Sequence, residues 1–143
     1  MHIYRTIPAT LEAISHMSQD IEADLQYLPA DKRGKVVLAL HELLVNIAVH
    51  AYGGAGGAID IVLTHTAATL GIVVTDAAAT TFTMPTVIRA LNPQDLPEHG
   101  MGLYIMHQTF DTVRYERLAQ GNRWHLTTAV SAGGEGELAG SGC

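Results

Sequence analysis

The chain has 143 residues, of which 48% are hydrophobic and 15% are charged, and its formal net charge is −6. This composition predicts one globular domain and excludes a disordered chain. The acidic balance and the lack of any run of lysine and arginine exclude the basic surface of a nucleic-acid-binding protein.

A strand and an amphipathic helix are expected at the start of the chain. Residues 2–8 have the extended pattern of an edge strand, and Thr10 can cap a helix over residues 11–27. Apolar residues recur along this helix at helical spacing: Leu11, Ile14, Met17, Ile21, Leu25 and Leu28. This stripe is either a core face or a homodimer surface, and we favour the core.

The next helix is the most apolar stretch of the chain. Asp31 is its expected N-cap, after a break at Pro29. The helix continues to Tyr52, where the glycine-rich residues 53–57 end it. Apolar residues occupy nearly every side, as in a helix buried in a core.

The second half of the chain predicts a hairpin, a long loop, a third helix and a second pair of strands. The expected elements are strands at 58–66 and 69–75, an irregular segment at 77–99, a helix at 100–110, strands at 112–118 and 123–130, and a disordered tail at 131–143. Strands cluster in this order and do not alternate with helices. The fold class is therefore α+β, a two-layer sandwich with helices on one face of a mixed, mostly antiparallel sheet, formed by residues 1–130.

Three polar residues interrupt the central helix on one face, because Glu42, Asn46 and His50 are spaced four residues apart. Burial of such groups is costly unless they have partners. One interpretation is a hydrogen-bonded pair in the core. The other is a site for a divalent cation and the polyphosphate that it carries, since Asn46 offers an oxygen ligand for Mg²⁺ and Glu42 can orient or deprotonate a nucleophile.

Two further motifs can join this site. Asp76 ends a strand, where its carboxylate can accept a hydrogen bond from a ligand amine or cap a turn. Gly100 and Gly102 stand at the expected start of a helix, where glycine lets the backbone approach a phosphate and the helix N-terminus favours an anion. Each motif alone is weak evidence for a ligand. The three motifs occur in the order Glu42 and Asn46, then Asp76, then Gly100 and Gly102, with a long loop between the second and third, and this order favours a nucleotide site.

These motifs resemble those of the GHKL ATPases, which have the Bergerat fold. Glu42-Leu-Leu-Val-Asn46, followed by His50-Ala-Tyr52, is similar to their N-box. Val74-Thr75-Asp76 is similar to the start of the G1 box, and His99-Gly-Met-Gly-Leu103 is similar to the G2 box.

The stretch 104–117, followed by Gly121-Asn-Arg123, resembles the anti-sigma-factor serine kinase branch of this family especially. The resemblance covers residues 1 to about 130.

The resemblance implies a role for each matching residue. Asn46 would hold the Mg²⁺ that bridges the phosphates of ATP, and Glu42 would be the general base toward a serine hydroxyl of a protein substrate. Asp76 would bind the adenine amine, residues 77–99 would form the ATP lid, and His50 would be structural or would support the site. The remaining nucleotide contacts would come from Ala78, Gly100, Met101, Gly102 and Leu103.

The sequence departs from the family at one position of the G1 box. Ala78 stands where the family has its first glycine after the aspartate. If that glycine has a positive φ or abuts the adenine, a methyl group costs strain or space. Arg89 is also the only cation in the lid, so Mg²⁺ and backbone amides would neutralise most of the phosphate charge.

Two hydrolase interpretations fail on the motifs. His41-Glu42 begins like a zinc-hydrolase motif, but Val45 replaces the second histidine of HExxH. A serine hydrolase of the nucleophile-elbow type would need a G-x-S-x-G motif, which the sequence lacks.

We therefore expect an ATP-binding anti-sigma regulatory factor in a partner-switching system. It would be a homodimer with serine/threonine protein kinase activity toward a STAS-type anti-anti-sigma protein, and a sigma factor would be its other partner. The alternative is a Bergerat-fold protein-binding regulator with weak or lost nucleotide binding and no kinase turnover.

A cytoplasmic location without membrane or nucleic-acid partners is expected. Cys143 is the only cysteine and cannot form an internal disulfide, which is typical of a reducing compartment. No signal-peptide pattern begins the chain, and no apolar run is expected to reach the roughly 18 residues of a membrane span.

Overall fold

The computed structural model of the chain describes residues 2–79 and 98–130. Its elements are β1 (His2–Pro8), α1 (Leu11–Asp24), α2 (Ala30–Asn46), η1 (Ile47–Ala51), β2 (Ala58–His65), β3 (Thr69–Asp76), α3 (Glu98–Thr109), β4 (Thr112–Leu118) and β5 (Gly121–Ala129). The expected disordered tail at 131–143 and most of the expected lid at 77–99 lie outside the described residues.

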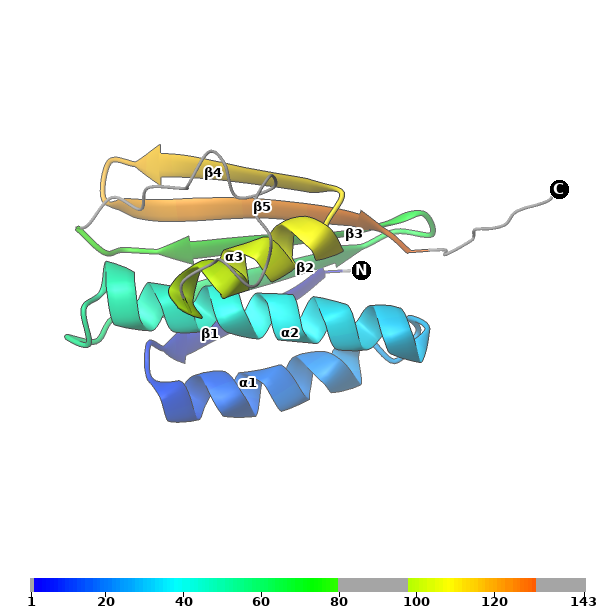
Figure 1. Ribbon diagram of the computed structural model, residues 1–143, viewed down its shortest axis with the longest axis horizontal. Coiled ribbons are helices and arrows are strands. Elements are labelled where there is room, and N and C mark those ends of the chain that lie inside the picture. The colour runs from blue at the N-terminus through cyan, green and yellow to red at the C-terminus, as the bar shows by residue number, and fades with distance from the viewer. Residues whose placement is uncertain (1, 80–97, 131–143) are drawn as a thin grey trace, which may run out of the picture.

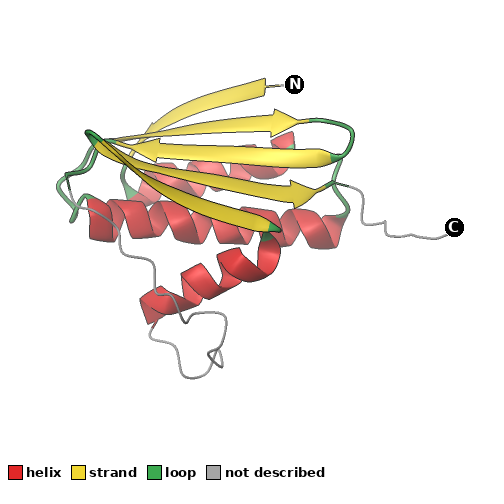
Figure 2. Ribbon diagram, turned by 90° about the horizontal axis from the view of Figure 1, so that it is seen from above, coloured by secondary structure: helices red, strands yellow, loops and turns green. Residues whose placement is uncertain are grey.

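The described elements form two layers, a five-stranded sheet and three helices that all cover the same face of it (Figure 2). The strand order is β1-β2-β3-β5-β4, and α2 lies between α1 and α3 (Figure 1). This confirms the predicted α+β class. The expectation of a mixed sheet is wrong, because every strand pair in the described sheet is antiparallel.

The connections explain the antiparallel pairing. Two of the four strand pairs are hairpins, which join antiparallel neighbours directly. Between β1 and β2 the chain runs out along α1 and back along α2, so β2 starts at the end of the sheet where β1 stopped (Figure 1). The backbone N–H of Ala9 donates to the carbonyl of Gly57 at 2.8 Å, which closes this return.

The core fills the space between the layers. Ile59, Ile61 and Leu63 of β2 alternate inward as predicted and are at most 1% exposed. The apolar stripe of α1 is a core face and not an exposed surface, since Ile14 and Ile21 are also almost fully buried. The largest fully buried side chain is Trp124 of β5, which packs between the sheet and the helices.

The two long helices start differently. Thr10 caps α1 as predicted, because its Oγ1 accepts from the N–H of Ala13 at 3.1 Å. The prediction that Asp31 caps the next helix is wrong. Pro29 occupies the cap position without a side-chain hydrogen bond, because its fixed φ of −55° already suits a helix start. Asp31 lies in the first turn of α2 instead.

The central helix does not continue as an α-helix to Tyr52, as the sequence suggested. It ends at Asn46 and changes into the π-helical segment η1, in which the N–H of Tyr52 donates to the carbonyl of Ile47 at 2.9 Å. π-helical turns inside α-helices occur frequently at functional sites. In this protein the π-helical turn begins directly after Asn46, the residue predicted to bind Mg²⁺.

Together α2 and η1 form a 22-residue helix, Ala30–Ala51, whose mean hydropathy is 1.3 in its most apolar window. By length and composition alone such a helix can cross a membrane, so the expectation that no stretch reaches that length does not hold. Half of this window is buried inside the domain. A core helix that packs against a sheet and two other helices has the same apolar composition.

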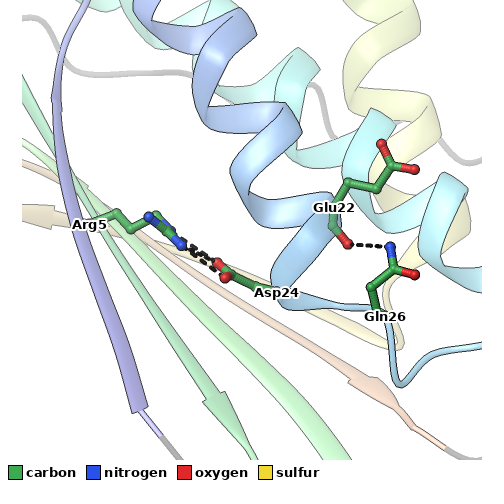
Figure 3. Close-up of polar contacts among 4 residues, drawn as sticks. All are labelled: Arg5, Glu22, Asp24 and Gln26. Atoms are coloured by element: carbon green, nitrogen blue, oxygen red, sulfur yellow. Dashed lines mark hydrogen bonds and ion pairs between the residues drawn. The ribbon is translucent and has the colours of Figure 1, made fainter.

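Polar contacts fix the far end of α1 to the sheet (Figure 3). The guanidinium of Arg5 on β1 donates from Nε and Nη2 to the carboxylate of Asp24, at distances of 2.7 to 2.9 Å. The Arg5 and Asp24 side chains are 28% and 16% exposed. Beside this pair, the side-chain amide of Gln26 donates at 3.1 Å to the carbonyl of Glu22, which also accepts from the backbone N–H of Leu25 at 3.3 Å.

We predict that this ion pair contributes more to stability than the exposed pair on α2. Asp24→Ala leaves a half-buried guanidinium unpaired and should cost roughly 1–3 kcal/mol of unfolding free energy. The matched control is Asp31→Ala, which removes an exposed ion pair with Lys35 at 3.4 Å and should cost less than about 1 kcal/mol. Urea unfolding of both variants measures the difference, and equal losses would contradict the prediction.

Candidate nucleotide-binding site

The first part of the site is a groove of ≈ 600 Å³ between the outer surfaces of α1 and α2. Its lining residues are Leu11, Ser15, His41, Glu42, Val45, Asn46, Val49 and His50. The structure thus brings all three predicted polar residues of the central helix together. Asn46 is 7% exposed and Glu42 is half-buried, and neither side chain makes a hydrogen bond within the described part of the chain.

The surroundings of Glu42 and Asn46 bear on the two interpretations of this pair. A core pair would be hydrogen-bonded to satisfy its buried polar atoms. Here the amide and the carboxylate are adjacent on one helix face and line a groove, and neither has a hydrogen-bond partner among residues 2–79 and 104–130. The pair is therefore available to a ligand, with an amide oxygen suited to Mg²⁺ and a carboxylate suited to accept a proton.

The second part of the site is a buried carboxylate on β3. Asp76 is 3% exposed and continues the inward alternation of Ile72 and Val74. Its Oδ1 accepts two hydrogen bonds of 2.9 Å, from the backbone N–H of Ala78 and from the side-chain amide of Asn122. Its Oδ2 is buried and has no hydrogen-bond partner among the described residues.

The second oxygen of the Asp76 carboxylate, Oδ2, is not explained by a turn cap. A turn cap alone would use Oδ1, which accepts from Ala78, and would not explain an acceptor buried without a donor. Leaving a buried charged acceptor unsatisfied costs free energy. A ligand amine that donates to Oδ2 would remove that cost, so the residue fits the adenine amine that the sequence resemblance implied.

Asn122 holds Asp76 in place from the neighbouring strand. The two residues lie opposite each other in the β3–β5 register. The Oδ1 of Asn122 accepts from the hydroxyl of Tyr115 and from Nη1 of Arg117 at 3.2 Å, so its amide group is oriented with Nδ2 toward the carboxylate. Three β4 and β5 side chains thus fix the position of the acceptor on β3.

Tyr52 connects this part of the site to the end of the central helix. Its hydroxyl donates to the carbonyl of Ala58 at 2.6 Å and accepts from the N–H of Ala77 at 2.8 Å. The ring lies against Gly57, where a Cβ atom would meet ring carbons at 2.2 Å. The residue that ends the N-box-like motif therefore binds the segment that follows Asp76.

Ala78 is accommodated in the core. It is 3% exposed, its N–H donates to Asp76, and its carbonyl accepts from Nη1 of Arg117 at 3.1 Å. Nη2 of Arg117 also donates to the carbonyl of Ala79 at 2.9 Å. The methyl group at this position of the G1 box thus packs among buried apolar residues, while the backbone contributes to the turn around the carboxylate.

The glycine motif differs from its prediction in one respect. Gly100, Met101, Gly102 and Leu103 lie inside the first turns of α3 (Glu98–Thr109), and the helix starts before the glycines and not after them. Glycine costs only about 1 kcal/mol in a helix interior, and the packing of α3 on α2 can offset this. The structure describes no side chain of residues 98–103.

The neighbouring His41 has a structural contact. Its Nδ1 lies 2.9 Å from the hydroxyl of Ser18 on α1, which also donates to the carbonyl of Ile14. Among the described residues, no three histidine, cysteine, aspartate or glutamate side chains gather closely enough to hold a metal ion by themselves. The zinc-hydrolase interpretation, which the motif already opposed, has no ligand cluster in this part of the chain.

Gly121 and Asn122 also lie beside Asp76 in the candidate site, where the sequence alone did not place them. Gly121 has a φ of +129°, and a Cβ atom there would lie 1.9 Å from the carbonyl oxygen of Asp76. The signal in the sequence was a polar Asn next to a turn glycine at the start of an otherwise alternating strand. Only the antiparallel register, which a single sequence does not reveal, places both residues beside Asp76.

Comparisons with known proteins agree on the fold. The family model described as a histidine kinase-like ATPase domain matches residues 6–128. The histidine kinase domain of the blue-light-activated histidine kinase of Erythrobacter litoralis EL346 is a similar solved structure, with a TM-score of 0.55 and 16% identity over 88% of this chain. The match spans 63% of that domain's own length. Among proteins with curated functions, none matches this sequence.

We predict that Gly121→Ala destabilises the protein by at least ~2 kcal/mol, because the new methyl group would collide with the backbone of Asp76 in a strained conformation. The matched control is Gly34→Ala in α2, where no atom lies within 4 Å. That substitution should stabilise the helix by about 0.5–1 kcal/mol. Chemical denaturation measures both, and a neutral Gly121→Ala would refute the close approach.

Proposed function

Because the chain belongs to the histidine kinase-like ATPase domain family, we propose that it binds ATP with Mg²⁺ and transfers the γ-phosphoryl group to a serine or threonine of a partner protein. The observation that carries the nucleotide part is the buried, unpaired Oδ2 of Asp76. An acceptor in this position suits an exocyclic amine such as that of adenine. Asn46 and Glu42, open in the groove, suit the phosphate end of the same ligand.

Each residue has a separate task in this reaction. Asn46 would contribute an amide oxygen to Mg²⁺, which supplies neutralisation of phosphate charge when it is bound. Glu42 accepts the proton of the substrate hydroxyl. The hydroxyl oxygen forms the new bond to the γ-phosphorus, the bond between that phosphorus and the bridging oxygen breaks, and ADP leaves. Positioning and charge neutralisation provide most of the acceleration in such transfers.

The regulatory part of the proposal is an anti-sigma factor in a partner-switching system. It is supported by the resemblance of residues 104–117 and of Gly121-Asn-Arg123 to the anti-sigma-factor serine kinases. A homodimer in the cytoplasm would bind a sigma factor, and a STAS-type anti-anti-sigma protein would compete for it and be the phosphorylated substrate.

One observation favours a second candidate, a protein-binding regulator without nucleotide turnover. Ala78 replaces a family glycine, and its methyl group is buried close to Asp76. If this methyl group occupied the space of the adenine ring, affinity for ATP would be low. The methyl group packs in the core, however, and the neighbouring Oδ2 remains free, so we place this candidate second.

Calorimetric titration of Mg²⁺-ATP and Mg²⁺-ADP tests the proposed function. We predict binding by the wild type and at least a ~10-fold loss of affinity in Asn46→Ala, since the amide is a direct metal ligand in the proposal. Glu42→Gln is the matched variant on the same helix. It should retain nucleotide binding and lose phosphoryl transfer to a candidate STAS-type protein, because the amide cannot accept the hydroxyl proton. A folded wild type that binds no nucleotide at millimolar concentration would exclude the kinase.

The substitution Ala78→Gly separates the two candidates. If the methyl group only fills the core, the variant should lose about 1 kcal/mol of stability and keep its ATP affinity within a factor of about two. If the methyl group obstructs the base, ATP affinity should rise at least ~10-fold. Calorimetry and urea unfolding on the same sample distinguish these results.

A further inference from the structure

Exposed apolar side chains gather around Glu42 on the helical layer. Leu11 is 57% exposed, Leu38 is 47% exposed and Val49 is 45% exposed. The helical spacing places Leu38 on the same face as Glu42, one turn before it, and outside the lining of the groove. Val49 lines the groove from the central helix, and Leu11 lines it from α1. Exposed apolar residues that cluster in this way mark interaction sites more often than singly scattered ones do.

The apolar surface and the reactive carboxylate form one continuous surface. Leu11, Val45 and Val49 line the groove together with Glu42 and Asn46. The helices α1 and α2 lie side by side (Figure 1). The groove that their residues line has the two-helix surroundings in which an amphipathic helix can dock. Leu38 and Val49 are about 16 Å apart along the axis, which corresponds to three helical turns of an occupant.

The acidic charge of α1 indicates which charge a helix bound in this groove should carry. The helix carries the exposed acidic residues Glu12, Asp20 and Glu22 and has no lysine or arginine. A partner that lies along this helix would therefore present basic residues to it. Its apolar residues would contact Leu11, Val45 and Val49 at one end and Leu38 at the other.

We propose that the groove between α1 and α2 is the docking surface for a short amphipathic helix of the substrate protein, which presents its serine or threonine hydroxyl to Glu42. This inference rests on the proposed function, since it names the surface through which the same site receives its protein substrate. Apolar contacts on both sides of Glu42 would hold the hydroxyl opposite the carboxylate, and the basic flank of the helix would lie over α1.

A pool of fluorescein-labelled synthetic peptides of about 14 residues tests the proposal. Each peptide has a central serine, leucine, isoleucine or valine at helical spacing around it, and lysines along one flank. Control peptides have the same composition in an order that spreads the apolar residues around the helix. Fluorescence anisotropy measures binding, and radiolabelled ATP measures transfer to the serine.

We expect the amphipathic peptides to bind at least ~10-fold more tightly than their scrambled controls. The variant Leu38→Asp should weaken this binding at least ~10-fold and leave the dissociation constant of Mg²⁺-ATP unchanged, because Leu38 is exposed and is not among the residues that line the nucleotide groove. Tyr4→Asp is the matched control, because Tyr4 is 77% exposed on β1, away from the groove. Circular dichroism establishes that all variants are folded. Glu42→Gln should retain peptide binding and lose transfer.

Equal binding of the scrambled peptides, or unchanged peptide binding by Leu38→Asp, would overturn the docking surface. Parallel calorimetry with Mg²⁺-ATP separates this failure from a failure of the proposed function. If Mg²⁺-ATP binds and no peptide in the pool does, the docking proposal falls and the kinase proposal stands. If the peptides bind and Mg²⁺-ATP does not, the kinase proposal falls and the groove remains a protein-binding surface.

Discussion

A single buried carboxylate sets the geometry on which this site depends. Asp76 is almost inaccessible to solvent, yet only its Oδ1 is hydrogen-bonded. A buried charge with one free acceptor is tolerated when the surrounding structure fixes it and when a ligand can complete it. Here the fixing groups come from both directions along the chain, from the turn at Ala78 and from Asn122 on β5. Both of these donors bind Oδ1, so neither of them satisfies Oδ2.

The rest of the domain fixes the position of Asp76 relative to Glu42 and Asn46. Tyr52 ties the π-helical end of the central helix to the segment after Asp76, and Gly121 lets β5 approach that segment closely. The helix that carries Glu42 and Asn46 is held against the sheet by a continuous core. Nucleotide recognition and phosphoryl transfer would therefore use groups positioned by the same packed layers. The antiparallel sheet and the buried face of each helix serve to keep these groups at fixed positions.

Much of this arrangement could be predicted from the sequence where local patterns decide the structure. Alternating apolar residues identified β2 and β3, helical spacing identified α1, and the interval between Glu42 and Asn46 placed both residues on one face. The predictions failed where contacts between residues distant in the sequence determine the structure. Helix α3 begins at Glu98, before the glycines, and the register of β5 places Asn122 beside a strand 46 residues earlier. Neither effect leaves a periodic signal in one sequence.

The most direct test of this account compares the affinities of the wild type for Mg²⁺-ATP and for Mg²⁺-inosine triphosphate by competition calorimetry. The two nucleotides differ at the position where adenine has an amine donor and hypoxanthine has a carbonyl acceptor. If the free Oδ2 of Asp76 recognises the amine, ATP should bind roughly 10- to 100-fold more tightly, since the carbonyl would leave a buried charged acceptor unpaired. Equal affinities of the two nucleotides would contradict the central claim that Asp76 recognises the adenine amine by a hydrogen bond.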